Sequence, residues 1–157
     1  EPPEQSMQTT TRVLIMSCLL LLGACDPQDR RPGLWLTGEE VTALPEDWSF
    51  SDQHQEIFVQ VGTPYLLPHS VTVWCSSVDG TLYLAARDPD SKNWPGWVED
   101  SPDVKIKIAD KVYPVTLVTL EDAAEIAGVQ QAYIAKYELP ATGGEFAQRY
   151  WRVAPRG

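Results

Sequence analysis

The side chains with the widest chemical range beyond residue 33 are Cys75 and the two histidines, His54 and His69. Cys75 could act as a nucleophile if a base lay beside it, and His69 is close to it in the sequence. Residues six apart in a β-strand are about 20 Å apart, which is too far for proton transfer. A free cysteine in a strand is commonly a small buried hydrophobic residue. The pattern therefore predicts a structural role for Cys75.

Motifs for a metal site or a hydrolase are incomplete in this sequence. Asp88, Asp90 and Glu99 stand at the first, third and twelfth positions of a calcium-loop pattern. The fifth and sixth positions lack the acid or amide and the glycine that such a loop needs. His54 and His69 have no Cys or His partner at zinc spacing, and the Gly-x-Ser-x-Gly motif does not occur. The sequence therefore predicts no metal site and no recognisable set of catalytic residues.

The chain is strongly acidic. Its 157 residues include 22 Asp and Glu against 12 Lys and Arg, which gives a formal net charge of −10. There is no run of basic residues to attract a phosphate backbone, so no nucleic-acid partner is expected. The length suits one domain, and 43% hydrophobic with 22% charged residues is typical of a globular protein.

The segment from Met7 to Cys25 has the three parts of a secretory signal. Arg12 lies in a short polar stretch, an apolar run follows from Val13 to Leu22, and two small residues precede the cysteine. The apolar run has about ten residues, whereas a helix needs about 20 to span a bilayer. We expect residues 1–24 to be a signal peptide whose translation starts at Met7.

The residues from Leu22 to Cys25 resemble the lipobox of bacterial lipoproteins. In that family the chain is cleaved before the cysteine, which carries lipid. The resemblance therefore implies lipidation of Cys25, with a membrane as partner and residues 25–32 as a polar tether. The expected location is the periplasmic side of the cell envelope, and Asp26 resembles the inner-membrane retention signal of enteric bacteria. Processing would leave Cys75 as the single thiol and exclude an internal disulfide.

Residues 33–157 are expected to form a mainly β domain. The Asp79-Gly80 turn is a strong hairpin signal, and Glu121–Tyr137 has the apolar spacing of a helix. Short helical turns are expected at Glu39–Leu44 and from Trp94. The predicted strands are Glu56–Val61, Ser70–Val78, Thr81–Arg87, Val104–Ala109, Val112–Leu120 and Phe146–Val153. This order predicts an α+β protein, a small closed β-barrel with flanking helices.

Four stretches of this domain are Val71–Ala86, Ser91–Trp94, Ser101–Ile106 and Tyr133–Tyr137. Together they resemble the split β-barrel superfamily of flavin and deazaflavin proteins. The resemblance extends over roughly residues 56–156 and implies a split β-barrel of about six strands. Members commonly bind a flavin, a deazaflavin or haem in a groove between two subunits, while others have no established ligand. It therefore implies a homodimer and leaves the cofactor open, with FMN or a related flavin as the candidate.

The same resemblance implies where a phosphorylated cofactor would be held. In the family, basic and hydroxyl side chains at strand ends contact the phosphate beside the barrel mouth, and an aromatic ring can stack on the flat ring system. The matching residues here are His69, Ser70, Arg87, Ser91, Lys92 and Trp94. In an alternative interpretation, Arg87 and Lys92 pair with acidic residues of their own loop, Asp88, Asp90 and Glu99.

Two functions remain open from the sequence. Because the sequence shows no recognisable set of catalytic residues, it favours an envelope lipoprotein with a non-enzymatic binding or structural role. The alternative is a flavin- or deazaflavin-dependent oxidoreductase that uses the region of Arg87, Ser91 and Lys92. Most of the six tryptophans are expected in the core, whereas Trp94 and Trp97 are predicted as an exposed pair that could bind a sugar, a peptide or a partner protein.

Overall fold

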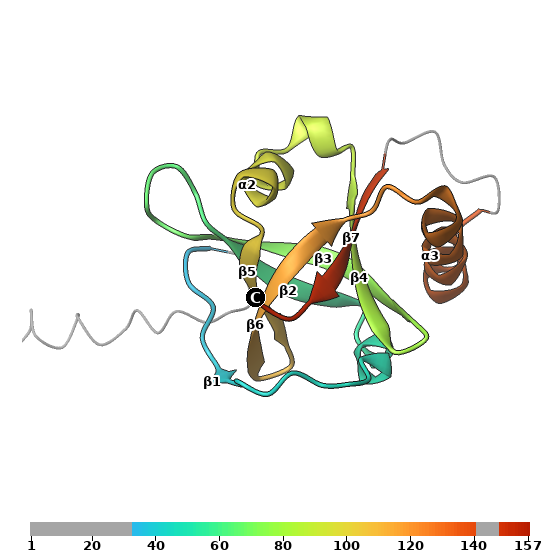
Figure 1. The fold of residues 1–157 in the computed structure, drawn as a ribbon, viewed down its shortest axis with the longest axis horizontal. Helices are drawn as coiled ribbons and strands as arrows, with labels where there is room; N and C mark the ends of the chain where they lie inside the picture. Colours follow the sequence, from blue (N-terminus) through green and yellow to red (C-terminus); the bar gives the residue numbers. More distant parts are fainter. Residues whose placement is uncertain (1–32, 141–147) are drawn as a thin grey trace, which may run out of the picture. The chain divides into compact units, whose positions relative to one another are not determined.

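Strands and short helices alternate along residues 33–140 and 148–157, the part of the chain that the computed structural model describes (Figure 1). The strands are β1 (Glu39–Glu40), β2 (Glu56–Val61), β3 (His69–Val78), β4 (Thr81–Arg87), β5 (Asp103–Ile108), β6 (Lys111–Thr119) and β7 (Gln148–Ala154). The helices are α2 (Trp94–Asp100), α3 (Ala123–Tyr137) and the 3-10 turns η1 (Ser49–Gln53) and η2 (Pro89–Ser91). The expected signal peptide, the tether and the predicted strand start at Phe146 lie outside the described residues.

Six antiparallel strands form a closed barrel (Figure 1). They are hydrogen-bonded in the order β6-β5-β2-β3-β4-β7, and β7 also pairs with β6, which completes the circle. Hairpins connect β3 to β4 and β5 to β6. The predicted split β-barrel of six strands with flanking helices is therefore confirmed. Closure leaves these strands with few unpaired edges.

Local signals place most of these elements where the sequence predicts them. β2 and β4 have the predicted bounds. Asp79 and Gly80 adopt φ values of 49° and 77°, the positive values that a tight hairpin turn of this kind requires. Helix α3 begins at Ala123 because Asp122 caps it, accepting a hydrogen bond from the Glu125 N–H at 2.7 Å.

The helical turn expected at Glu39–Leu44 is wrong. Glu39 and Glu40 instead form β1, which runs parallel to the start of β6. The Glu39 N–H donates to the Asp110 carbonyl at 2.9 Å. Gly38 has φ 148°, and a Cβ there would lie 2.5 Å from the same carbonyl oxygen. Glycine therefore permits a backbone contact that the apolar pattern of this segment does not reveal.

Side chains from every barrel strand fill the interior. The largest that are almost fully buried include Ile57, Val59, Leu82, Leu84, Ile106, Ile108, Val115 and Trp151. The ring of Trp94 on α2 lies 5.0 Å from that of Trp151, and Trp94 is only 6% exposed. The prediction that Trp94 and Trp97 form an exposed pair is therefore wrong, because α2 turns Trp94 into the core and leaves Trp97 partly buried at its edge.

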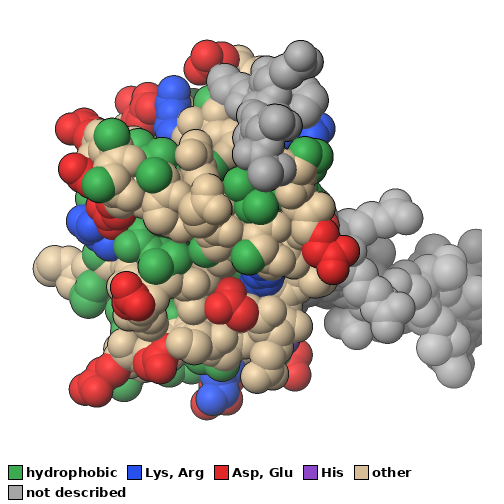
Figure 2. All heavy atoms as spheres, turned by 90° about the vertical axis from the view of Figure 1, so that its right-hand side faces the viewer, with side chains coloured by type: hydrophobic (Ala, Val, Ile, Leu, Met, Phe, Trp, Pro, Cys, Tyr) green, Lys and Arg blue, Asp and Glu red, His purple; other side chains and the backbone are tan. Residues whose placement is uncertain are grey.

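Helix α3 covers the outer face of β3, β4 and β7. Tyr133 and Val129 of the helix are buried in a second cluster with Tyr83 and Tyr150 of the barrel. Acidic side chains are spread over this side of the molecule (Figure 2). The strands beneath α3 are thus buried on both faces, while other parts of the barrel face solvent.

We predict that Leu84→Ala lowers the free energy of unfolding by about 2–5 kcal/mol, because it opens a cavity in the barrel interior. Leu84 is fully buried, whereas Leu67 is 47% exposed and carries the matched control Leu67→Ala. The control should change stability by no more than about 0.5 kcal/mol. Urea unfolding followed by circular dichroism measures both, and equal effects would contradict the interior placement of Leu84.

Candidate functional site

Three residues of the predicted cofactor site come together in the turn after β4. The Lys92 ammonium donates to the Arg87 carbonyl and lies 3.4 Å from the Asp88 carbonyl. The Ser91 hydroxyl donates to the Asp88 carbonyl at 2.7 Å. The Arg87 guanidinium forms an ion pair with the Asp88 carboxylate at 3.7 Å. These side chains therefore stabilise their own turn, in which Asp88 has φ 50°.

The other three predicted residues make different contacts. The Ser70 hydroxyl donates to the Leu34 carbonyl at 2.7 Å, so the segment before β1 covers it. The His69 ring meets the edge of Trp97 at 5.6 Å. The Trp94 ring is packed in the core beside Trp151. The structure thus gathers Arg87, Ser91 and Lys92 in one turn, and the cofactor role of the whole set stays a prediction.

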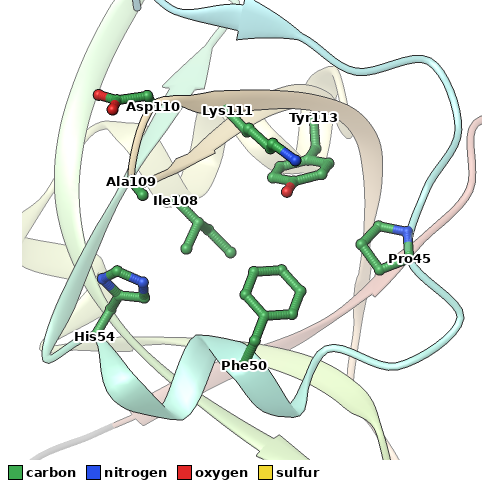
Figure 3. A pocket seen from close by; sticks show the side chains of 8 residues that line it. All are labelled: Pro45, Phe50, His54, Ile108, Ala109, Asp110, Lys111 and Tyr113. Atoms are coloured by element: carbon green, nitrogen blue, oxygen red, sulfur yellow. The ribbon is translucent and has the colours of Figure 1, made fainter.

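A pocket of about 500 Å³ opens at the end of the barrel, between η1 and the turn that joins β5 to β6 (Figure 3). It is lined by Pro45, Phe50, His54, Ile108, Ala109, Asp110, Lys111 and Tyr113. The side chains of Phe50, Ile108 and Tyr113 converge in its centre, while the Asp110 carboxylate points away. Its volume lies in the range of small-molecule sites, which are mostly apolar with a few placed polar groups.

Tyr113 supplies one polar group of this pocket, and the His54 ring and the Lys111 ammonium supply others. Its residue is 4% exposed, its ring packs edge-on against Trp48 at 5.1 Å, and its hydroxyl points toward Phe50 and Ile108. Burial raises the pKa of this phenol, with a smaller contribution from the Glu39 carboxylate. The hydroxyl is therefore a neutral hydrogen-bonding group at physiological pH. The arrangement can hold a small flat or apolar molecule that offers polar atoms to these groups.

A second cluster, around Cys75, was not anticipated from the sequence. Strand β3 continues past the start of β2, whose first residue pairs with Trp74. Beyond that point, side chains accept the hydrogen bonds that β3 would otherwise donate to a neighbouring strand. The Cys75 N–H donates to the Tyr137 hydroxyl at 3.0 Å, and the Ser77 N–H donates to the Asp52 carboxylate at 2.9 Å. Helix α3 and η1 therefore take the place of the missing strand.

Lys136 joins this cluster from α3. Its ammonium donates to the Cys75 carbonyl at 2.7 Å, lies 3.5 Å from the Asp52 carboxylate and is 3.6 Å from the Cys75 sulfur. Burial raises the pKa of the Cys75 thiol, and the nearby Lys136 charge offsets only part of that effect. Cys75 is thus buried and protonated at neutral pH, as its predicted structural role requires. The helical spacing of α3 marks its core-facing side, but it gives no indication that Lys136 reaches the strand edge.

Two further features concern metal binding and membrane crossing by residues 33–140 and 148–157. In this part of the chain, no group of three His, Cys, Asp or Glu side chains is placed to hold a metal ion. Over the same residues, no helix combines the length and the apolar composition needed to cross a membrane.

Solved structures match the arrangement of the strands. An F420-H2 dependent reductase matches with a TM-score of 0.52 and 18% identity, over 64% of this chain and 94% of that protein. A conserved hypothetical protein from Mycobacterium tuberculosis matches with a TM-score of 0.54 and 12% identity, over 77% and 87%. This chain has the split β-barrel fold.

A NimC/NimA family protein from Clostridium acetobutylicum also matches, with a TM-score of 0.50 and 10% identity, over 69% of this chain and 82% of that one. No protein-family model matches the sequence, and no curated protein matches it. At these identities the likeness establishes the fold and leaves the chemistry to be argued from the site.

Alkaline pH should destabilise the protein through its buried acids. Burial is the largest cause that raises the pKa of Tyr133, Tyr137, Tyr150 and Cys75. A folded-state pKa above the unfolded value means that the unfolded chain loses protons first as the pH rises. We therefore predict that the free energy of unfolding is constant near neutral pH and falls above about pH 9, where unfolded Cys and Tyr ionise.

Tyr133→Phe tests this dependence. The Tyr133 hydroxyl lies 2.9 Å from the Trp74 carbonyl and 3.1 Å from the Tyr83 carbonyl. Its loss should cost about 1–3 kcal/mol at neutral pH and flatten the alkaline fall by up to about 1.4 kcal/mol per pH unit. Tyr65 is 54% exposed, so Tyr65→Phe is the matched control and should follow the wild type. An unchanged alkaline slope in Tyr133→Phe would contradict the prediction.

Proposed function

We propose that this protein is a lipid-anchored component of the bacterial cell envelope whose split β-barrel binds a partner molecule without catalysing a reaction. The anchor is Cys25, at the end of a segment with the composition of a lipoprotein signal. The barrel would then face the periplasm, and Asp26 favours the inner membrane if the host sorts lipoproteins as enteric bacteria do.

One observation carries the non-enzymatic part of this proposal. Most of the polar side chains that the split-barrel resemblance matched to a cofactor phosphate already have partners within the chain. Lys92 and Ser91 donate to carbonyls of their own turn, and the Ser70 hydroxyl donates to Leu34. A phosphate would have to compete with these hydrogen bonds, and it would meet an acidic loop around Asp88 and Asp90.

The pocket lined by Phe50, Ile108 and Tyr113 supports a binding role instead. Its wall combines the apolar side chains with the Tyr113 hydroxyl, the His54 ring and the Lys111 ammonium. The chemical class that fits is a small aromatic or aliphatic molecule with hydrogen-bonding groups that these side chains can meet. Such a ligand would be bound by burial of its apolar surface, with the phenol setting its orientation.

A flavin- or deazaflavin-dependent oxidoreductase is the second candidate. The shared fold with an F420-H2 dependent reductase is the observation that favours it. In this case Arg87, Ser91 and Lys92 would exchange their contacts in the turn for contacts to the cofactor phosphate, and a homodimer would complete the groove.

The visible absorption spectrum of the protein purified from its native host separates the two candidates. We predict a colourless protein that remains colourless after incubation with FMN and desalting. Exchange of both Arg87 and Lys92 for alanine should then lower the free energy of unfolding by about 1 kcal/mol, because the turn after β4 loses their hydrogen bonds and ion pair. A flavin or haem band near one equivalent per chain would contradict the first candidate, and loss of a flavin band in the double variant would favour the second.

A further inference from the structure

Five large apolar residues are left exposed on one side of the domain, and we call them the apolar patch. They are Leu34, Trp35, Tyr65, Leu66 and Leu67, each between 47% and 93% exposed. They belong to two segments, residues 33–38 before β1 and residues 62–68 between β2 and β3. Neither segment contains a charged residue, although the chain carries a net charge of −10. Contiguous exposed apolar residues of this size indicate an interaction surface.

Hydrogen bonds hold residues 33–38 against β2 and β3, the two strands that residues 62–68 connect. The Ser70 N–H donates to the Gly33 carbonyl at 2.9 Å, and the Ser70 hydroxyl donates to the Leu34 carbonyl at 2.7 Å. The Leu36 N–H donates to the side-chain oxygen of Gln60 at 2.7 Å. The apolar patch is therefore part of the folded domain and lies on the side of the barrel away from α3 (Figure 1).

The turn at residues 63–67 presents its apolar side chains to solvent. The Thr63 hydroxyl donates to the Leu67 carbonyl at 2.6 Å, and the Leu66 N–H lies 3.3 Å from the Thr63 carbonyl. Leu66 has φ 66° and is 93% exposed. A leucine in a left-handed conformation is strained, and here no burial within the domain compensates for it. The Leu66 side chain is therefore available for burial against a partner outside the domain.

The length of chain between the apolar patch and the proposed anchor limits which partner can bury the patch. Only residues 25–32 separate the end of the signal from Gly33, and eight residues span at most about 28 Å. If Cys25 carries lipid, Gly33, which directly precedes Leu34 and Trp35 of the apolar patch, is held within that distance of the bilayer surface. Trp and Tyr are the residues that favour the boundary between lipid and water.

We propose that the apolar patch inserts into the surface of the membrane to which Cys25 is anchored. This inference rests on the proposed lipid anchor. Apolar burial supplies the contact, because the acidic domain gains nothing from an anionic lipid surface. The lipid on Cys25 holds the chain at the bilayer, and the patch orients the barrel with α3 away from the bilayer.

Tryptophan quenching by brominated lipid tests the insertion. The lipid-modified protein is reconstituted into vesicles of phosphatidylcholine and phosphatidylglycerol with brominated acyl chains. We expect strong quenching that is mostly lost in Trp35→Phe. Trp74 is the matched control, because it is 42% exposed and stacks on Tyr137 of α3 at 4.3 Å between ring centres. Trp74→Phe should keep the quenching of the wild type.

The membrane fraction of Cys25→Ser separates failure of the patch from failure of the anchor. If the wild type floats with membranes, Cys25→Ser does not, and Trp35 is unquenched, the anchor stands and the insertion is refuted. If Cys25→Ser still floats with membranes and is processed like the wild type, the lipid anchor on which the inference rests is refuted, whatever the quenching. If Trp35 is unquenched and Leu66→Ser converts a dimer into a monomer by light scattering, the patch binds a second copy and the proposal is overturned.

Discussion

The double pairing of β7 is the interaction on which the rest of the domain depends. This strand pairs with β4 along one side and with β6 along the other, so it turns an open sheet into a barrel. Its Trp151 is fully buried in the interior, while Tyr150 lies on the outside beneath α3. Arg149 forms an ion pair with Glu99 of α2, and Arg152 forms one with Glu125 of α3 at 2.7 Å. Barrel closure and the placement of both helices therefore depend on the same seven residues, Gln148–Ala154.

Closure also determines where a ligand can bind. Because the interior is filled by aliphatic and aromatic side chains, a small barrel of this kind has no room for a cofactor within it. What remains are the barrel ends and the outer surface. One end carries the pocket of Phe50 and Tyr113, and one side carries the uncharged segments around Trp35 and Leu66. The polar groups near Arg87 and Lys92 are occupied in shaping the turn that leads to α2.

The sequence predicted the elements whose signals are local. The Asp79-Gly80 turn and the apolar spacing of α3 each act over a few residues, and each is confirmed. Contacts between distant residues were missed. β1 forms because Gly38 allows a close approach to Asp110, and Trp94 is buried because its ring packs against that of Trp151.

The difference between local signals and contacts between distant residues also explains why the Cys75 cluster and the pocket were not predicted from the sequence. The cluster of Cys75, Lys136 and Asp52 depends on the difference in length between β2 and β3, which leaves part of one strand for a helix to complete. The pocket depends on η1 folding across the end of the barrel. Neither arrangement has a motif, because the residues involved are brought together from separate parts of the chain by the sheet.

The central claim is that the side chains matched to a cofactor are structural, so that the barrel is complete without a flavin. Calorimetric unfolding of the purified protein with increasing FMN tests this most directly. A ligand that binds the folded state adds about 2.7 kcal/mol of stability at 100 times its Kd, and Tm rises with its concentration. The account predicts a Tm that stays constant across the FMN series, and a saturable rise in Tm would contradict it.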